Sequence, residues 1–321
     1  MLVTVIVSAI SLGMVFLYGC IGEILTEKGG HLNLGIPGVM CLGMSGSALG
    51  VSLYMSMWQN PADCSYILLL LFAIVFAVLV SAFGGLIYAF LTVTLRCNQN
   101  ITGLALTTFG AGLAQALLNV TDSTNLSLAA RKISLGLPFA DSLGWFGQIF
   151  LSHGILVYLA IGIAVALGIV LKHTRLGLEL RAVGESPATA DAAGINVTAY
   201  KYGAILIGSA IAGLGGLFYA MDFSKGNLEN VTTIQAFGWL SIALVIFTLW
   251  RPTLAIAGSV LFGALYLAGN FIVGLSFAQK MLFKLVPYVV TVVVLVVTSI
   301  FDSKNAQAPL GLGVTYFRED R

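Results

Sequence analysis

The sequence predicts an all-α polytopic membrane protein, a single transmembrane domain over residues 1–321 that crosses the bilayer about nine times. Hydrophobic residues make up 59% of the chain and charged residues only 9%, and the mean hydropathy is +1.00. Because soluble proteins carry roughly 25–35% charged residues on their surfaces, this chain cannot cover a soluble domain. Apolar runs of about 20 residues, the length that spans a bilayer core, recur from one end to the other.

Nine apolar runs are long enough to be considered as spans, and a polar segment at 121–148 separates the fourth from the fifth. The expected spans are residues 2–22, 37–58, 66–95, 101–119, 151–171, 202–221, 235–250, 253–275 and 282–301. The run 235–250 is the shortest, so a re-entrant course for it stays open.

The distribution of Lys and Arg predicts the orientation. An odd number of crossings puts the two termini on opposite sides, and cytoplasmic loops carry the excess of basic residues. An outside N-terminus places ten basic residues in the cytoplasm: Lys28, Arg96, Lys172, Arg175, Arg181, Lys201, Arg251, Lys304, Arg318 and Arg321. It leaves five outside: Arg131, Lys132, Lys225, Lys280 and Lys284. We therefore expect the N-terminus outside and the C-terminus in the cytoplasm.

Residues 171–201 form a polar island between the fifth and sixth spans. Ser186 is a suitable N-cap, Pro187 a suitable first helical residue, and Gly194 followed by apolar Ile195 is typical of a left-handed helix stop. The predicted helix has roughly two turns and is too short to persist alone in water. Two interpretations stay open: a surface helix that joins two spans, or a helix that docks on another protein.

Two connections are unusually rich in glycine and polar residues, at 27–38 and at 96–108. Non-helical backbone at membrane depth is tolerated only where protein buries it or where it lines a water-filled cavity. We expect both connections to dip into the membrane and line a path, although ordinary cytoplasmic turns remain the alternative.

The chain has no signature of an enzyme. No Lys follows a Gly, so the Gly-Lys-Ser/Thr loop that binds nucleotide phosphates is absent, and His31, His153 and His173 lack metal-ligand spacing. Acidic and basic residues such as Glu23 and Asp222 are expected only at the edges of spans. Ion-driven carriers usually place ionisable groups within the membrane, so this distribution favours an energy source outside the membrane.

Three stretches resemble motifs of one transporter group. Residues 177–197 resemble the cytoplasmic coupling segment of bacterial ABC-type permeases, in the group that includes ribose and branched-chain amino-acid importers. Residues 30–38 resemble its Gly-x-x-Asn-Leu-Gly-x-x-Gly signature, and residues 98–106 its Asn-Gln-x-Ile-x-Gly-Leu-Ala-Leu element. Together with residues 237–252 they are similar to the nucleoside-importing branch, with departures at Pro37, commonly acidic, and Asn100, usually apolar.

The resemblance implies a permease subunit that forms half of the path of an ATP-driven importer in the bacterial inner membrane. The solute would be neutral and polar, with a nucleoside as the first expectation and a simple sugar as the alternative. The implied partners are an ABC ATPase subunit that holds ATP and Mg²⁺, a second and different permease, and an extracytoplasmic lipoprotein-type solute-binding protein. No cofactor on this chain and no nucleic acid are expected. An ion-coupled secondary transporter and a non-transporting membrane-anchored partner are the rival classes.

Candidate path residues are amides, which suit base edges and sugar hydroxyls, and aromatic rings, which can stack on a base. They are Asn33, Gln99, Asn100, Phe109, Phe237 and Trp239. Neutral groups that equally suit helix contacts are Thr107, Thr108, Gln115, Asn119, Ser241 and Thr248. The candidates for coupling to the ATPase are Arg181, Glu185, Asp191 and Gly194.

Overall fold

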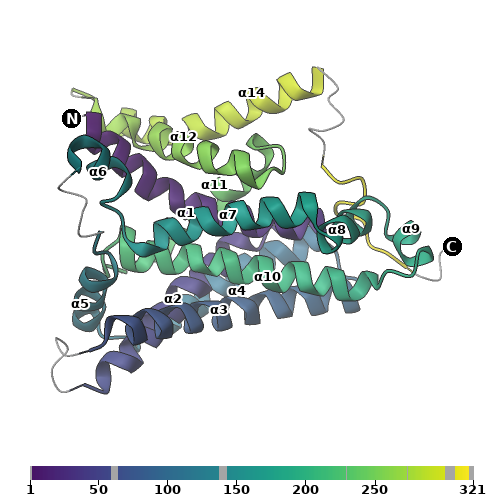
Figure 1. The fold of residues 1–321 in the computed structure, drawn as a ribbon, viewed down its shortest axis with the longest axis horizontal. Coiled ribbons are helices and arrows are strands. Elements are labelled where there is room, and N and C mark those ends of the chain that lie inside the picture. The colour runs from purple at the N-terminus through teal and green to yellow at the C-terminus, as the bar shows by residue number, and fades with distance from the viewer. Residues whose placement is uncertain are drawn as a thin grey trace.

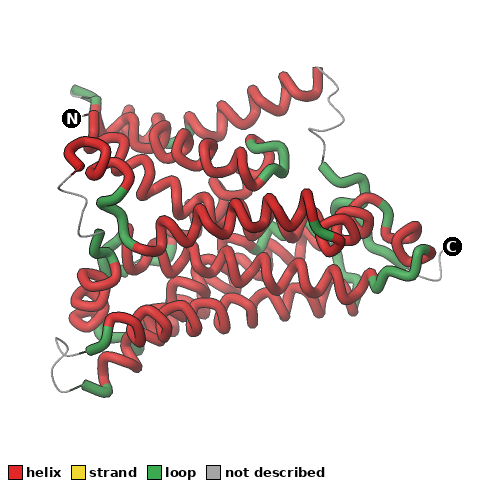
Figure 2. Tube along the Cα trace, viewed as in Figure 1, coloured by secondary structure: helices red, strands yellow, loops and turns green. Residues whose placement is uncertain are grey.

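A computed structural model describes residues 2–58, 64–136, 143–228, 230–272, 274–300 and 308–317. In these ranges every regular element is a helix (Figure 2). The helices are α1 (Leu2–Lys28), α2 (Ile36–Ser56), α3 (Tyr66–Ala89) with its π-helical end η2 (Phe90–Thr94), α4 (Gln99–Leu118), α5 (Ser123–Ile133), α6 (Gly144–Phe150), α7 (Ile155–His173), α8 (Arg175–Glu185), α9 (Pro187–Ala192), α10 (Val197–Phe218) with its π-helical end η4 (Tyr219–Phe223), α11 (Thr232–Phe247), α12 (Pro252–Phe271), α13 (Phe277–Phe283) and α14 (Val286–Ile300).

Eight segments of the described chain are long and apolar enough to cross a membrane, and α11 is a shorter ninth. With 16 residues, α11 reaches about 24 Å, less than a bilayer core of roughly 30 Å. It nevertheless joins the two ends of the bundle. Before it, Gly226 packs against Leu126 of α5, and after it the Trp250 indole N–H bonds Glu27 near the end of α1. Within the described ranges the chain therefore passes between the two ends nine times, as expected.

Helices α1, α2 and α10 form the centre of the bundle (Figure 1). In the apolar stretches of α2 and α10, 83% and 78% of the residues are buried, against 11% in the stretch that contains α14. Helices α2 and α10 are therefore central and α14 is peripheral. A Cβ on Gly43 would lie 2.1 Å from the Gly213 carbonyl oxygen. The backbones of α2 and α10 thus touch, and a small residue at the crossing permits that approach.

The connection between α1 and α2 dips beside α4, as the sequence predicts. The Leu34 carbonyl accepts a hydrogen bond from Thr107 Oγ1 at 2.8 Å. Thr107 lies eight residues into α4, which is about 12 Å along that helix. The Tyr88 hydroxyl donates to the Leu32 carbonyl at 2.7 Å. Side chains of α3 and α4 therefore satisfy backbone groups that lipid could not.

The second predicted dip, at 96–108, is wrong. Arg96 turns the chain with φ 58°, and α4 then begins at Gln99. The Asn98 side-chain oxygen accepts from the N–H groups of Asn100 and Ile101 at 3.0 and 3.1 Å. This cap satisfies the first free N–H groups of α4 and so stabilises the start of the helix. Residues 96–108 are therefore a tight turn followed by regular helix.

The prediction that ionisable groups lie only at the edges of spans stays a prediction, but two of these groups are buried inside the bundle. Helix α1 continues six residues past the expected end at Gly22, and Glu23 and Glu27 are only 0% and 3% exposed. The Asn33 N–H donates to Glu23 Oε1 at 2.9 Å, and the Trp250 indole donates to Glu27. The dipping connection and the turn after α11 bury these carboxyl groups. Both carboxyl groups lie in the last six residues of α1, so they are near one end of the helix although they are buried.

Candidate functional site

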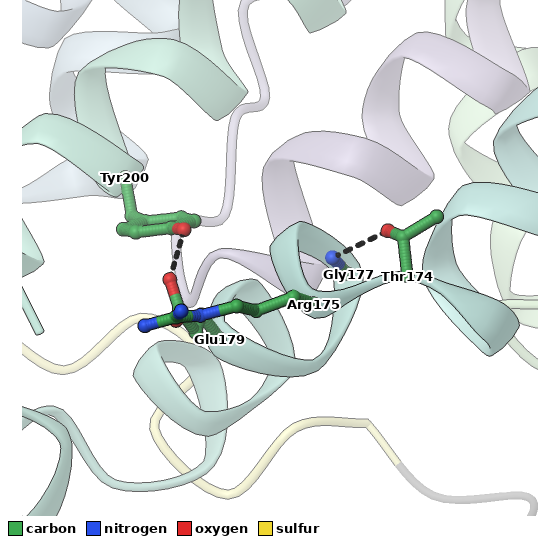
Figure 3. Close-up of polar contacts among 5 residues, drawn as sticks. All are labelled: Thr174, Arg175, Gly177, Glu179 and Tyr200. Atoms are coloured by element: carbon green, nitrogen blue, oxygen red, sulfur yellow. Dashed lines mark hydrogen bonds and ion pairs between the residues drawn. The ribbon is translucent and has the colours of Figure 1, made fainter.

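The polar island contains two helices, of which the sequence predicts only the second. The first, α8, begins after Thr174, whose Oγ1 accepts from the Gly177 N–H at 3.1 Å (Figure 3). It buries Leu180 and Val183 toward the bundle. The signal that could have revealed α8 is this cap followed by apolar residues three positions apart.

The second helix, α9, confirms the predicted start and stop. Ser186 Oγ accepts from the Thr189 N–H at 3.4 Å, and Pro187 occupies the first turn. Gly194 has φ +81°, and the Ile195 N–H donates to the carbonyl of Ala190 at 3.0 Å. The side chain of Ile195 packs on a small buried cluster of Val183, Ala190 and Val197. This six-residue helix is therefore stabilised by contacts with α8 and α10 rather than by its own length.

Glu179 joins α8 to α10. Its carboxylate accepts a hydrogen bond from the Tyr200 hydroxyl and pairs with Arg175 Nε at 2.6 Å (Figure 3). These bonds lower the pKa of Glu179, the Tyr200 bond first, so the carboxylate stays ionised. The Arg175 side chain is 89% exposed, and exposed ion pairs contribute little. The bond to Tyr200 is therefore the one that positions α8.

Residues 308–317, which we call the C-terminal strap, cover the island. Two of the strap's backbone N–H groups donate to backbone carbonyls: Gly311 to Gly184 at 2.9 Å and Gly313 to Gly30 at 3.2 Å. Two more bonds reach carboxylates: the Leu310 N–H donates to Glu185 Oε2 at 3.1 Å, and the Tyr316 hydroxyl donates to Asp191 Oδ2 at 2.8 Å. It thereby ties α8, α9 and the α1–α2 connection together. The sequence does not predict the strap, because these residues show no helical or strand periodicity.

The predicted coupling residues lie on one surface formed by α8, α9 and the strap. Glu185 and Asp191 accept hydrogen bonds from the strap, while Arg181 donates weakly to the Gly177 carbonyl at 3.4 Å. Arg181, Glu185 and Gly194 are exposed and Asp191 is half-buried. Their role in coupling stays a prediction.

Two of the predicted path residues meet at the dipping connection. The Leu32 N–H donates to Gln99 Oε1 and the Gly35 N–H donates to Asn33 Oδ1, both at 2.9 Å. Gln99 is 3% exposed and Asn33 is fully buried. In this structure the two amides hold the backbone of the connection in place.

The predicted aromatic residues do not gather at one place. Phe237 is 2% exposed and lies at the centre of an aromatic cluster. Its edge-on neighbours are the rings of Phe16, Tyr219, Phe223 and Tyr266, with centroids 5.4, 5.9, 6.0 and 5.5 Å away. Trp239 is half-buried two positions later, and Phe109 is 46% exposed on α4. Phe237 therefore belongs to the packed interior of this chain.

Helix α4 presents an uncovered face that contains polar side chains. Asn100, Thr108 and Asn119 are exposed on it and Gln115 is half-buried. The other neutral candidates are buried and bonded to backbone carbonyls: Thr107 to Leu34, Ser241 to Phe237 and Thr248 to Leu244.

Helix α3 provides the contrast, because the residues that it exposes are apolar, Leu71, Val75, Leu79 and Phe83 among them. Such a face suits lipid. Polar side chains at membrane depth instead face a bundle interior or water. Helix α4 exposes Ile101, Leu104 and Phe109 as well, so its face is mixed, and its polar positions suit contact with a second protein or with a water-filled path.

A comparison with known families decides the class. The model of the branched-chain amino acid transport system / permease component family matches residues 5–295. The chain belongs to this family. It is thus a multi-pass membrane permease component rather than an enzyme, which confirms the resemblance noted in the sequence.

Individual permeases are similar over most of their length. The nucleoside ABC transporter permease protein NupC of Lactococcus lactis subsp. cremoris (strain MG1363) is 32% identical over 94% of this chain and 93% of its own. The guanosine ABC transporter permease protein NupQ of Bacillus subtilis (strain 168) is 28% identical over 94% and 92%. The putative glucose ABC transporter permease protein TsgC13 of Haloferax volcanii is 30% identical over 78% and 72%.

In a permease of this family the two parts of the site lie in different places. The α8–α9 surface lies at one end of the bundle, outside the expected spans, whereas the polar face of α4 runs along a membrane helix (Figure 1). Family membership therefore favours an ABC permease over an ion-driven carrier.

Proposed function

We propose that this permease forms one half of the translocation path of an ATP-driven importer of nucleosides. The observation that carries the proposal is the exposed face of α4, with its hydroxyl and amide side chains. These groups donate and accept hydrogen bonds without charge, which suits a base edge and ribose hydroxyls. The names of the two relatives similar over 94% of the chain support the nucleoside. The putative glucose permease keeps a simple sugar as the alternative.

A second, different permease would complete the path. The exposed polar face of α4 is open to such a partner, and interhelical hydrogen bonds are one of the forces that join helices in membranes. Lactococcus lactis has two nucleoside ABC permeases with different sequences, to which this chain is 32% and 25% identical. That pairing of names supports a hetero-dimer over two copies of one chain.

The α8–α9 surface would dock on a separate ATPase subunit, which holds ATP and Mg²⁺ and supplies the energy. Basic residues at the same end of the bundle support a cytoplasmic location for it. Lys28, Lys172, Arg181 and Arg251 line one hollow beside α8. The N-terminus and α5 would then lie outside, where a lipoprotein-type binding protein delivers the solute. The predicted cytoplasmic position of Lys304 falls outside the described residues.

Uptake of labelled inosine, uridine, ribose and leucine, in cells with and without the gene, tests the solute. We expect the loss of nucleoside uptake alone. Loss of ribose or leucine uptake with nucleoside uptake intact would overturn the nucleoside assignment. Unchanged uptake of all four compounds would contradict the proposed solute, while the assignment to the permease family would still hold.

Accessibility of single cysteines tests the path. On a background without the native cysteines, Thr108→Cys and Gln115→Cys on α4 should react with a water-soluble thiol reagent in the assembled transporter, because water reaches a path. Leu79→Cys on α3 is the matched control and should stay unreactive in lipid, although it is 61% exposed in the isolated chain. Equal reactivity of α3 and α4 positions would contradict the assignment of α4.

A further inference from the structure

A polar cavity of about 500 Å³ lies where α10 begins, beside α9, the helix proposed to dock on the ATPase, which we call the coupling helix. Its walls come from the α1–α2 connection at His31, the turn after α3 at Arg96, the end of α9 with the first turn of α10 (191–201) and the C-terminal strap at Tyr316. These four segments are far apart in sequence. The cavity is separate from the exposed face of α4, and none of the residues predicted to line the path lies in its wall.

Lys201 is the unusual group in this wall. Its side chain is only 4% exposed, and within the described ranges no carboxylate or hydrogen-bond acceptor pairs with it. Removing an ammonium group from water without a partner is costly, and buried charges are normally paired or bound to an ion. Lys201 lines the cavity, so an anion in the cavity could reach it.

The N-terminus of α10 faces the same cavity and also favours an anion. Asn196 Oδ1 accepts from the Ala199 N–H at 3.0 Å. The N–H groups of Val197 and Thr198 have no acceptor among the described residues, and both residues line the cavity. Free N–H groups and the positive end of the helix dipole together bind anions at the start of a long helix.

The wall also holds two groups of opposite charge, Arg96 and Asp191. Arg96 lies in the wall with its guanidinium 4.7 Å from the centre of the Phe317 ring. Asp191 is the carboxylate in the wall, and it already accepts the Tyr316 hydroxyl at 2.8 Å. Burial, and then the charge of Lys201, lower the pKa of His31 to about 3, so this ring adds no charge at neutral pH.

We propose that this cavity binds the phosphate group of an anion from the side of the membrane where the coupling helix lies. Lys201 and the free N–H groups of α10 would hold the phosphate oxygens, and Arg96 would attract it from the rim. The source is either a small phosphate compound or the headgroup of an anionic lipid. Because the strap and the end of α9 form other walls of the cavity, an occupied cavity ties the coupling helix to the strap.

Inorganic phosphate is the probe for the first source. Full-length permease in dodecyl maltoside micelles is titrated into phosphate, and binding is followed by broadening of the phosphorus NMR signal. We expect the dissociation constant to rise roughly tenfold or more in Lys201→Met, since a charge-assisted contact is lost. Lys172→Met removes one exposed charge at the same end of the bundle and is the matched control, with less than about a twofold change expected.

Native mass spectrometry with phosphatidylglycerol tests the lipid source. Retention of this lipid by the parent chain and its loss in Lys201→Met would assign the cavity to a headgroup, whereas phosphate binding alone assigns it to a soluble compound. Failure of both probes to bind, or equal binding by Lys201→Met and the parent chain, overturns the proposal.

Thermal unfolding provides a readout that does not depend on transport. Without phosphate, Lys201→Met should unfold at a higher temperature than the parent chain, because it removes an unpaired buried charge. Phosphate should raise the unfolding temperature of the parent chain and not of the variant. A lower temperature for Lys201→Met without phosphate would show that Lys201 has a structural partner and contradict the proposal. If Lys201→Met does not fold, Arg96→Asn, which tolerates the left-handed backbone, should still weaken phosphate binding.

Discussion

A substitution at Gly194 tests the backbone conformation of the α9 helix stop without changing other contacts. Gly194 has φ +81°, and a Cβ added there would meet no atom within 4 Å, so a larger residue causes no collision. Only the left-handed backbone opposes it, at about 1–2 kcal/mol for a residue other than glycine. That free energy lowers the ratio of closed to open helix ends by roughly 5–30-fold. Val, which is β-branched, should lie at the upper end of this range, and Asn, which tolerates this conformation, at the lower end.

Hydrogen exchange of the amides in residues 186–197 measures this opening. We expect exchange at Ile195, whose N–H closes the helix end, to speed up by roughly 5–30-fold in Gly194→Val, because local opening sets the rate. Gly203→Ala is the matched control, since its Cβ also meets nothing within 4 Å but its φ is not positive. Unchanged exchange in Gly194→Val would refute the reasoning about the backbone.

The same variant then tests coupling. In the reconstituted transporter, Gly194→Val should insert normally but lose transport and solute-stimulated ATP hydrolysis, because α9 no longer presents a fixed surface to the ATPase. If exchange speeds up and stimulation stays at the level of the parent chain, α9 is only a connecting helix. That result would favour the other interpretation, in which the island only joins two spans.

Three further results are expected. Tyr316→Phe removes the hydroxyl that holds the strap on α9, a bond worth about 1.5–3 kcal/mol when the acceptor is charged, so hydrogen exchange in residues 308–317 should rise. Unchanged exchange would show that the strap does not depend on this bond. Trp250→Phe leaves a buried carboxyl group without its indole donor, which costs about 1–3 kcal/mol of stability. It should therefore lower the unfolding temperature more than the control Trp239→Phe, which breaks no hydrogen bond seen in the described chain. An impermeant thiol reagent added to intact cells should label Val120→Cys and not Thr189→Cys; the reverse pattern would invert the membrane orientation.

Features set by neighbouring residues could be predicted from the sequence. The spans follow from apolar runs, and their observed ends differ from the expected ones by a few residues. The start and stop of α9 follow from Ser186, Pro187 and Gly194, all within nine positions. The second dip was predicted from its glycine and polar content, yet a single local cap at Asn98 turns it into a helix.

Features that depend on distant contacts could not be predicted. Glu27 and Trp250 are 223 positions apart, and Tyr316 and Asp191 are 125 apart. Nothing near Glu27 in the sequence indicates that α1 continues past it and that an indole covers it. The polar face of α4 is an intermediate case. The sequence names its polar residues, but only the packed structure separates Thr108, which is exposed, from its neighbour Thr107, which is bonded to Leu34.

The C-terminal strap also has a consequence for how the protein is made. Residues 308–317 follow α14, so the helices of the described chain leave the ribosome before these residues do. Until then Glu185, Asp191 and the Gly184 carbonyl lack the partners that the strap supplies. The surface beside α9 is therefore finished only after the described helices have been made. A nascent chain that stalls before residue 308 cannot present it, and an ATPase that recognises the finished surface would assemble only with permeases whose membrane domain is complete.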